Sequence, residues 1–246
     1  MQTQKKKIVE NSEIKIVILC GGKGTRLSEE TKKIPKPMVK IGTKPILIHI
    51  MNFYKSHGFS NFILAVGYKG YFIKNYFKKN KHFKTVKIVN TGQNTLTGGR
   101  LLRLKKYFKK NEDFMLTYGD GITNLNLKSL LKFHKRKNKI ATITAVKPPV
   151  RFGELKIKKN LVKKFEEKPQ SSAGWINGGF FVLNSKFIKY IKNDLTMLEK
   201  EPLEKLVKLK QLVAFKHHGF WKCMDTLRDK ILLNQLLRKK KAPWLT

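Results

Sequence analysis

The chain of 246 residues is long enough for one sizeable α/β domain that buries a hydrophobic core without disulfide bonds. It contains no apolar run close to the roughly 18 residues of a membrane span, and Met1 to Lys7 lacks the apolar region of a signal peptide. We therefore expect a cytoplasmic protein with no membrane partner. The two cysteines, Cys20 and Cys223, are too few for a disulfide framework, and we expect both to be small core residues.

The net charge of +38 comes from 54 lysines and arginines against 16 aspartates and glutamates. A charge of this size raises the alternative of a nucleic-acid binder. However, lysines occur along the whole chain, and only seven basic residues are arginine, whose forked side chain is suited to reading bases. This distribution favours a general lysine bias, with no specific nucleic-acid partner. We expect non-specific attraction of polyanions at low salt and steering of anionic substrates.

The first part of the chain alternates short apolar runs, rich in β-branched residues, with segments whose apolar residues recur at helical spacing. This alternation predicts a Rossmann-like α/β fold. In such a fold a mostly parallel sheet carries helices on both faces and binds ligands at the carboxyl ends of its strands. The predicted strands are 14–19, 62–66, 86–89, 114–118 and 140–146, and the predicted helices are 44–57, 69–77, 101–108 and 127–137.

From residue 152 to 165 the segments become shorter and alternate, which predicts a small antiparallel patch and makes the sheet mixed. No internal repeat or low-complexity linker divides the chain, so we predict a flexible N-terminal extension at 1–13 and one domain at 14–246. The remaining predicted elements are a strand within 175–183 and helices at 197–209 and 225–237.

A glycine-rich loop, Gly21-Gly22-Lys23-Gly24, directly follows the first predicted strand. Glycines let the backbone approach phosphate oxygens and leave successive N–H groups free to bind an anion. Arg26 and Lys36 add positive charge, so the pattern indicates a site for a nucleoside triphosphate. The spacing excludes a Walker loop, and Leu27 stands where a dinucleotide fingerprint requires its third glycine. The alternative is a loop that only reverses the chain.

Two carboxylates, Asp120 and Asp225, are candidates for a metal site. Asp120 lies between two glycines just after the predicted strand 114–118, at the carboxyl edge of the sheet, where phosphates would bind. Two carboxylates with several waters suit Mg²⁺ better than a softer metal. The alternatives are a turn residue for Asp120 and a helix N-cap before Thr226 for Asp225.

Two further stretches offer groups for a sugar phosphate. Lys168 within Glu166-Glu167-Lys168-Pro169 provides a cation. Asn177 provides an amide beside Gly178 and Gly179, which permit close approach of a ligand.

Together these motifs resemble the sugar-phosphate nucleotidyltransferases, and among them the glucose-1-phosphate cytidylyltransferases. The resemblance runs from about residue 14 to residue 244. The glycine-rich loop with Pro35-Lys36-Pro37 marks the broad superfamily. The stretches typical of the cytidylyl branch are Thr97-Gly98-Gly99-Arg100, Met224-Asp225-Thr226-Leu227-Arg228-Asp229-Lys230 and Lys241-Ala242-Pro243-Trp244.

The resemblance implies that 14–246 is a nucleotidyltransferase domain that passes a cytidylyl group from CTP to glucose 1-phosphate, giving CDP-glucose and pyrophosphate. It implies the following roles. The catalytic residues would be Arg26, Lys36 and Asp120, the Mg²⁺ ligands Asp120 and Asp225, and the sugar-phosphate ligands Lys168, Asn177 and Gly178. The nucleotide-binding residues would be Leu19, Cys20, Gly21, Gly22, Lys23, Gly24, Thr25, Arg26, Lys36, Thr95, Arg100 and Gly119.

The implied reaction is an in-line attack by a phosphate oxygen of the sugar phosphate on the α-phosphorus of CTP. The attacking phosphate is already anionic and needs no general base, so the site has to bring two polyanions together and neutralise their charge. Cations and a metal ion supply that charge. The resemblance also implies a homo-oligomer and a role in the synthesis of deoxysugars or surface polysaccharides such as O-antigen.

The chain departs from the family between Phe77 and Thr91, where it has a short basic connection and the cytidylyltransferases carry a longer segment. Base preference and oligomeric state therefore stay open. The alternatives are a related nucleotidyltransferase that uses UTP, dTTP or GTP, or mannose 1-phosphate, and a basic nucleotide or nucleic-acid binder without turnover. A glycosyltransferase is disfavoured because Gly121 and Ile122, rather than an Asp-x-Asp motif, follow Asp120.

Overall fold

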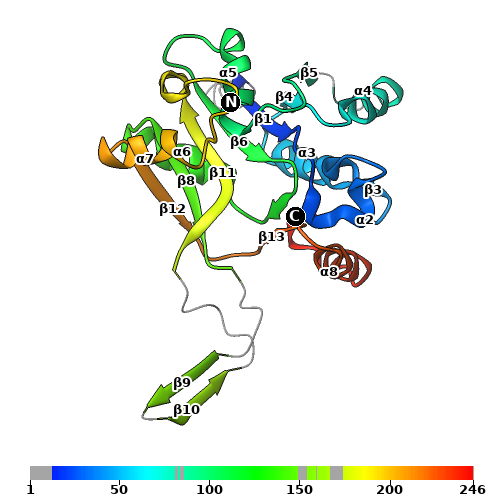
Figure 1. Cartoon of the computed structure of the whole chain (residues 1–246), viewed down its shortest axis with the longest axis vertical. Coiled ribbons are helices and arrows are strands. Elements are labelled where there is room, and N and C mark those ends of the chain that lie inside the picture. The colour runs from blue at the N-terminus through cyan, green and yellow to red at the C-terminus, as the bar shows by residue number, and fades with distance from the viewer. Residues whose placement is uncertain are drawn as a thin grey trace, which may run out of the picture.

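The first strand, β1 (Lys15–Cys20), is buried on both of its faces. Ile16 and Ile18 pack into one hydrophobic cluster and Val17 and Leu19 into another, because side chains alternate along a strand. Such a strand belongs inside a sheet that is covered on both sides. The computed structural model, which describes residues 13–80, 83, 86–148, 154–158, 160–166 and 174–245, contains this sheet (Figure 1).

The central sheet has seven strands in the order β12-β8-β11-β6-β1-β4-β5. β11 runs antiparallel to both of its neighbours, and the other pairs are parallel. The predicted mixed, mostly parallel sheet is therefore confirmed. Besides β1, its strands are β4 (Asn61–Val66), β5 (Val86–Asn90), β6 (Asp113–Tyr118), β8 (Ala141–Val146), β11 (Ile176–Asn184) and β12 (Leu212–His217).

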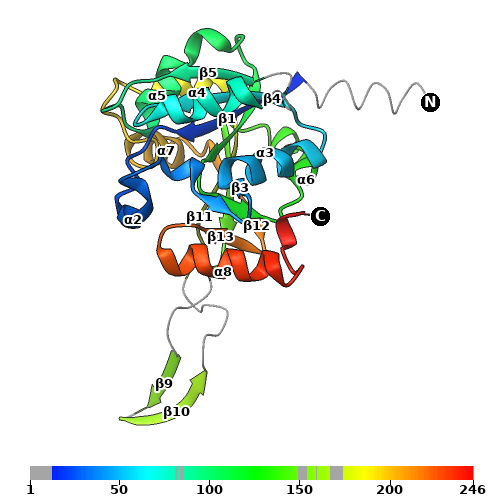
Figure 2. The ribbon, with the colours of Figure 1, turned by 90° about the vertical axis from the view of Figure 1, so that its right-hand side faces the viewer.

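Helices cover both faces of the sheet, as predicted. α3 (Ile46–Ser56), α4 (Gly70–Lys79), α6 (Leu127–Lys137) and α8 (Leu227–Arg238) contribute to one cluster. α5 (Thr97–Arg103) and α7 (Glu201–Lys208) contribute to the opposite cluster. Figure 2 shows α8 running alongside β13. The short helices are α2 (Ser28–Thr31) and the 3₁₀ turns η1 (Thr25–Leu27), η2 (Lys36–Met38), η3 (Lys105–Tyr107), η4 (Ser185–Tyr190) and η5 (Pro243–Leu245).

In the described parts of the chain, three two-stranded antiparallel sheets accompany the central one. β9 (Glu154–Lys158) pairs with β10 (Leu161–Glu166), which confirms the predicted antiparallel patch. β2 (Lys40–Ile41) pairs with β3 (Lys44–Pro45). β7 (Gly121–Thr123) pairs with β13 (Trp221–Cys223), with Cys223 opposite Gly121. The last pair matters for the site, because β7 follows Asp120 and β13 precedes Asp225.

Some boundaries differ from the predicted ones. The helix expected from residue 101 begins at Thr97, because Gly98 and Gly99, poor helix formers, gain tertiary hydrogen bonds to the carbonyl of Thr196. The helix expected from residue 197 begins at Glu201. β12 was not predicted. It is an edge strand with half-buried and exposed side chains, and a four-residue apolar run such as Leu212 to Phe215 does not by itself distinguish a strand from the end of a helix.

Residues 1–12 of the predicted N-terminal extension lie outside the described residues. Across the described ranges, no helix has the length and apolar character needed to cross a membrane.

The carboxylate of Asp113, at the start of β6, supports one prediction about stability. Burial would raise its pKa, but hydrogen bonds from His134 and Asn184 outweigh burial and hold the pKa below its usual value. A lowered pKa in the folded state stabilises the protein above the unfolded pKa of about 3.9, and this contribution is lost as the pH falls through the folded pKa. We expect Asp113→Asn to lower the free energy of unfolding by about 1–2 kcal/mol at neutral pH.

Urea unfolding of wild type and variant over a series of falling pH values measures this effect. The difference between the two proteins should shrink toward acid pH. A constant difference at all pH values would contradict a role for the ionised carboxylate.

Candidate active site

A cavity of about 530 Å³ opens at the carboxyl ends of β1 and β6. After β1, the chain forms β4 and β5 next to one edge of β1. It then returns to place β6 next to the other edge of β1. A crevice forms where the strand order reverses in this way, because the loops leave the sheet in opposite directions. The sequence-predicted residues that line it are Leu19, Cys20, Gly21, Gly22, Gly24, Thr25, Arg26, Lys36, Thr95, Arg100, Gly119, Asp120, Asn177, Gly178 and Asp225.

Two predicted site residues are not among the lining residues. Lys23 is on the glycine-rich loop and does not line the cavity. Lys168 lies outside the described residues.

The glycine-rich loop is held in a left-handed turn at Gly24, whose φ is +66°. A Cβ atom at this position would lie 2.9 Å from Thr31 Cγ2, so a side chain is excluded by space as well as by backbone conformation. The Thr31 hydroxyl donates to the carbonyl oxygens of Gly24 and Leu27, both at 3.0 Å. These contacts fix the turn that brings Arg26 to the cavity.

The buried guanidinium of Arg100 connects the glycine-rich loop to its neighbours. It donates to the carbonyl oxygen of Gly21 at 2.8 Å, to that of Gly92 at 2.8 Å and to the hydroxyl of Thr91 at 2.8 Å. Burial lowers its pKa from the usual value. Arg100 therefore positions the loop through its fork of donors, in addition to lining the cavity.

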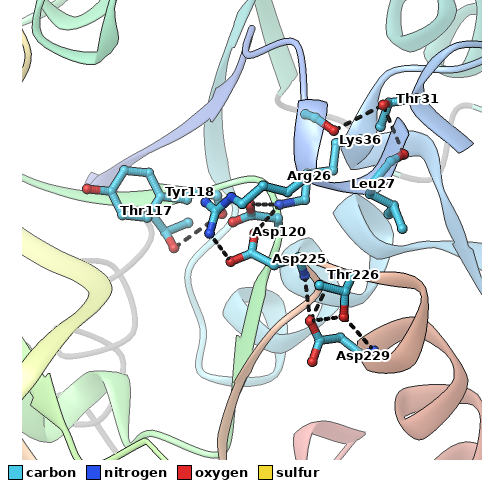
Figure 3. A network of polar contacts seen from close by, with 11 residues as sticks. Arg26, Leu27, Thr31, Lys36, Thr117, Tyr118, Asp120, Asp225, Thr226 and Asp229 are labelled. Carbon is cyan, nitrogen blue, oxygen red and sulfur yellow. Dashed lines mark hydrogen bonds and ion pairs between the residues drawn. The ribbon is translucent and has the colours of Figure 1, made fainter. Parts of the chain in front are cut away.

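Lys36 lies between the two predicted metal ligands. Its ammonium donates to Asp120 Oδ2 and to Asp225 Oδ1, both at 2.6 Å, although the residue is only 7% exposed. Burial would lower the pKa of Lys36, but attraction to Asp120 and hydrogen bonds to both carboxylates raise it above its usual value. Arg26 Nη1 donates to Asp225 Oδ2 at 2.6 Å, and Figure 3 shows both cations reaching the carboxylates.

The two carboxylates meet because β7 pairs with β13 and because the N–H of Met224 donates to the carbonyl of Asp120 at 2.9 Å. The helix-capping alternative for Asp225 is wrong. Thr226 is the N-cap of α8, and Asp229 completes a capping box with it, as Figure 3 shows. Asp229 also accepts from the N–H of Asp225, which leaves the Asp225 carboxylate directed toward the site.

The donor set can be compared with the requirements of a divalent metal. The carboxylate oxygens of Asp120 and Asp225 and the sulfur of Cys223 lie within 4.8 Å of one another. Burial and the neighbouring Asp120 raise the pKa of the Cys223 thiol, so it stays protonated and is a poor ligand for a hard cation. The two carboxylates, which already share the Lys36 ammonium, fit Mg²⁺. Both cysteines line the cavity. Cys20 is a buried core residue as predicted, but the same prediction is wrong for Cys223, which is half-buried because its strand β13 lies beside the cavity.

Sequence reasoning missed several residues that line the cavity. Glu199 is the most informative of them, because it adds a third carboxylate to the cavity wall, and its partners are Thr97 and Tyr118. The signal was weak, since a glutamate just before Glu201 and Pro202 resembles the acidic first turn of a helix. Trp221 also lines the cavity and donates its indole N–H to the carbonyl of Gly178 at 2.7 Å.

The family model described as Nucleotidyl transferase matches residues 15–226 of this chain. The chain belongs to the nucleotidyl transferase family. Among curated relatives of this nucleotidyltransferase, the glucose-1-phosphate cytidylyltransferase of Salmonella typhimurium is 49% identical over 255 residues, covering 95% of this chain and 99% of the relative. The probable glucose-1-phosphate cytidylyltransferase of Bacillus subtilis is 44% identical, covering 94% and 99%. The mannose-1-phosphate guanyltransferase of Saccharomyces cerevisiae is 34% identical, covering 90% and 63%.

Solved structures agree with this membership. HddC from Yersinia pseudotuberculosis, complexed with GMP-PN, is 28% identical with a TM-score of 0.72, covering 91% of this chain and 99% of the other. The alignment with the Salmonella enzyme has 255 positions, more than the 246 residues of this nucleotidyltransferase. The relative therefore has residues for which this chain has no counterpart.

The contacts of Arg100 generate a prediction for this site. We expect Arg100→Met to lower the free energy of unfolding by about 2–3 kcal/mol, because buried acceptors lose their donor. Nucleotide affinity should fall as well, because the loop loses its anchor. Arg100→Lys keeps the charge but loses the fork, and it should restore only part of either property. Urea unfolding and calorimetric titration with CTP measure the two effects, and an Arg100→Met protein with both properties intact would contradict the anchoring role.

Proposed function

We propose that this nucleotidyltransferase transfers a cytidylyl group from CTP to glucose 1-phosphate, giving CDP-glucose and pyrophosphate. The observation that carries the proposal is the 49% identity, over nearly the full length of both chains, to a glucose-1-phosphate cytidylyltransferase. The cavity supports it, because it joins a glycine-rich loop, two cations and two carboxylates at one edge of the sheet.

The chemistry requires charge neutralisation more than proton transfer. A phosphate oxygen of the sugar phosphate attacks the α-phosphorus of CTP, the bond to the β-phosphate oxygen breaks, and pyrophosphate leaves with the electron pair. Lys36 and Arg26, which pair with Asp120 and Asp225, would turn to the phosphates when substrates bind. Because both side chains already lie at the cavity wall, a short movement would bring their charges to the phosphates.

We assign the remaining roles by the same argument. Asp120 and Asp225 would hold Mg²⁺, which when bound supplies positive charge to the triphosphate and the leaving group. The loop from Leu19 to Arg26, with Thr95, Arg100 and Gly119, would bind the nucleotide. Asn177 and Gly178, with Lys168, would bind the sugar phosphate.

The cellular setting is also a proposal. We expect a cytoplasmic enzyme whose product serves deoxysugar or surface-polysaccharide synthesis. We further expect a homo-oligomer, and the exposed apolar side chains of Leu227 and Ile231, one turn apart on α8, are consistent with a subunit contact.

A second candidate is transfer from GTP to mannose 1-phosphate. The likeness to a mannose-1-phosphate guanyltransferase and to a structure complexed with GMP-PN favours it over transfer from UTP or dTTP. Pyrophosphate release with glucose 1-phosphate or mannose 1-phosphate, each combined with CTP, UTP, dTTP, ATP and GTP, separates the two candidates. Release with CTP and glucose 1-phosphate alone supports the proposal, and silence in every combination would refute both.

The two carboxylates give a direct test of the mechanism. We expect Asp120→Asn and Asp225→Asn each to reduce kcat by at least about 100-fold in Mg²⁺. Each variant leaves the buried Lys36 ammonium with one carboxylate partner, so the free energy of unfolding should also fall, by about 1–3 kcal/mol. Glu204→Gln, an exposed substitution on α7, is the matched control and should retain wild-type turnover. Near-wild-type turnover in either aspartate variant would refute the assigned metal site.

A further inference from the structure

Residues 194–198, between η4 and α7, are hydrogen-bonded to residues 96–98 at the start of α5. The N–H of Leu96 donates to the carbonyl of Asp194 at 2.9 Å, and the N–H of Gly98 donates to that of Thr196 at 3.0 Å. The N–H of Leu198 donates to Thr97 Oγ1 at 2.9 Å. Residues 194–198 are therefore held at a defined position beside the cavity.

This packing explains why glycines occupy positions 98 and 99. A Cβ atom at Gly99 would lie 2.3 Å from the carbonyl oxygen of Asp194, and one at Gly98 would lie 2.7 Å from that of Thr196. The obstructing atoms are backbone, so they cannot move aside as a flexible side chain could. The Thr97-Gly98-Gly99 motif is thus required by the docking of this segment.

Glu199 directly follows residues 194–198, and its side chain lines the cavity. Thr97 Oγ1 donates to Glu199 Oε2 at 2.6 Å, and the Tyr118 hydroxyl donates to Glu199 Oε1 at 2.5 Å. Asn177 Nδ2 donates in turn to the Tyr118 hydroxyl at 3.4 Å. Glu199 is therefore oriented from both sides.

The chemistry of this carboxylate suits hydroxyl groups. Among the described residues, each Glu199 oxygen has one hydrogen-bond partner, and it retains a lone pair for a second donor. Both present partners are neutral hydroxyls, whereas Lys36 and Arg26 pair with Asp120 and Asp225. An anionic phosphate would be repelled here, but a sugar ring offers neutral hydroxyl donors.

We propose that Glu199 determines sugar specificity by accepting hydrogen bonds from hydroxyl groups of the hexose ring, and that Thr97 and Tyr118 are positioning residues for it. The inference rests on the proposed transfer to a sugar 1-phosphate. The hexose is favoured over the ribose of the nucleotide because Tyr118 connects Glu199 to Asn177, on the side of the cavity assigned to the sugar phosphate.

Binding of the product separates the sugar from the nucleotide without turnover. We expect Glu199→Gln, which keeps the size of the side chain, to weaken CDP-glucose binding about tenfold or more in calorimetric titration, while CDP binding changes less than about twofold. Thr97→Val and Tyr118→Phe should each give a smaller loss of the same kind. Glu201→Gln, an exposed carboxylate two residues further along, is the matched control and should bind both ligands as wild type does.

Kinetics with sugar 1-phosphates provide the second test. Glu199→Gln should raise KM for the preferred sugar 1-phosphate and leave KM for the nucleotide unchanged. A deoxy analogue that lacks the contacted hydroxyl should have a lower kcat/KM than the intact sugar 1-phosphate with wild type. With Glu199→Gln, the two sugar 1-phosphates should have nearly equal kcat/KM values.

The outcomes distinguish this inference from the function on which it rests. If Glu199→Gln lost the same affinity for CDP as for CDP-glucose, Glu199 would contact the ribose, and the inference would be wrong. Unchanged binding of CDP-glucose to this variant would also overturn it. A lower melting temperature without a change in binding would show a purely structural role and also overturn it. Wild type that uses no sugar 1-phosphate at all would overturn the proposed function together with the inference, whereas an active wild type with an unaltered Glu199→Gln variant would overturn the inference alone.

Discussion

The arrangement of the whole site depends on one buried cation, the ammonium group of Lys36. A buried lysine is unfavourable unless carboxylates compensate its charge, and Asp120 and Asp225 both do so at 2.6 Å. The three residues come from η2, from the turn after β6 and from the segment between β13 and α8. A single charge cluster thus joins the early, middle and late parts of the chain. The groups that stabilise one another in this cluster are the same groups that would contact phosphates and metal during the proposed reaction.

The topology of the sheet divides the cavity into two chemical regions. The parallel strands β1 and β6 end beside the glycine-rich loop, Lys36 and Asp120, where charges of both signs meet. The antiparallel strand β11 enters on the other side of β6 and brings Asn177 and Gly178 to the cavity. There the neighbours are hydroxyls and the Glu199 carboxylate. Phosphates and sugar hydroxyls have opposite electrostatic requirements, and the cavity can meet both because different strands supply its two sides.

The large positive charge of the chain makes its few acidic residues informative. Several of them pair with basic residues in the folded protein, as Glu112 does with Lys15, Asp194 with Arg103 and Asp229 with Lys222. Asp120, Asp225 and Glu199 line the cavity, where Asp120 and Asp225 also pair with Lys36. In a protein with 54 basic and 16 acidic residues, three carboxylates in one cavity require specific structural support, and each of the three has it.

The sequence by itself determined the class of fold, most strands and helices, and the residues of the glycine-rich loop, because these follow from spacing among neighbours in the chain. α6 has its predicted bounds, and Asp120 and Asp225 were identified as a pair because each stands in a distinctive local motif. Only the tertiary structure decided that Thr226, rather than Asp225, caps α8, and that Arg100 holds the loop by its carbonyl groups. It also revealed Glu199, whose place in the cavity depends on the close backbone packing that Gly98 and Gly99 allow. Contacts between segments so far apart in the chain leave no periodic pattern in either segment, and this is why the sequence could not predict them.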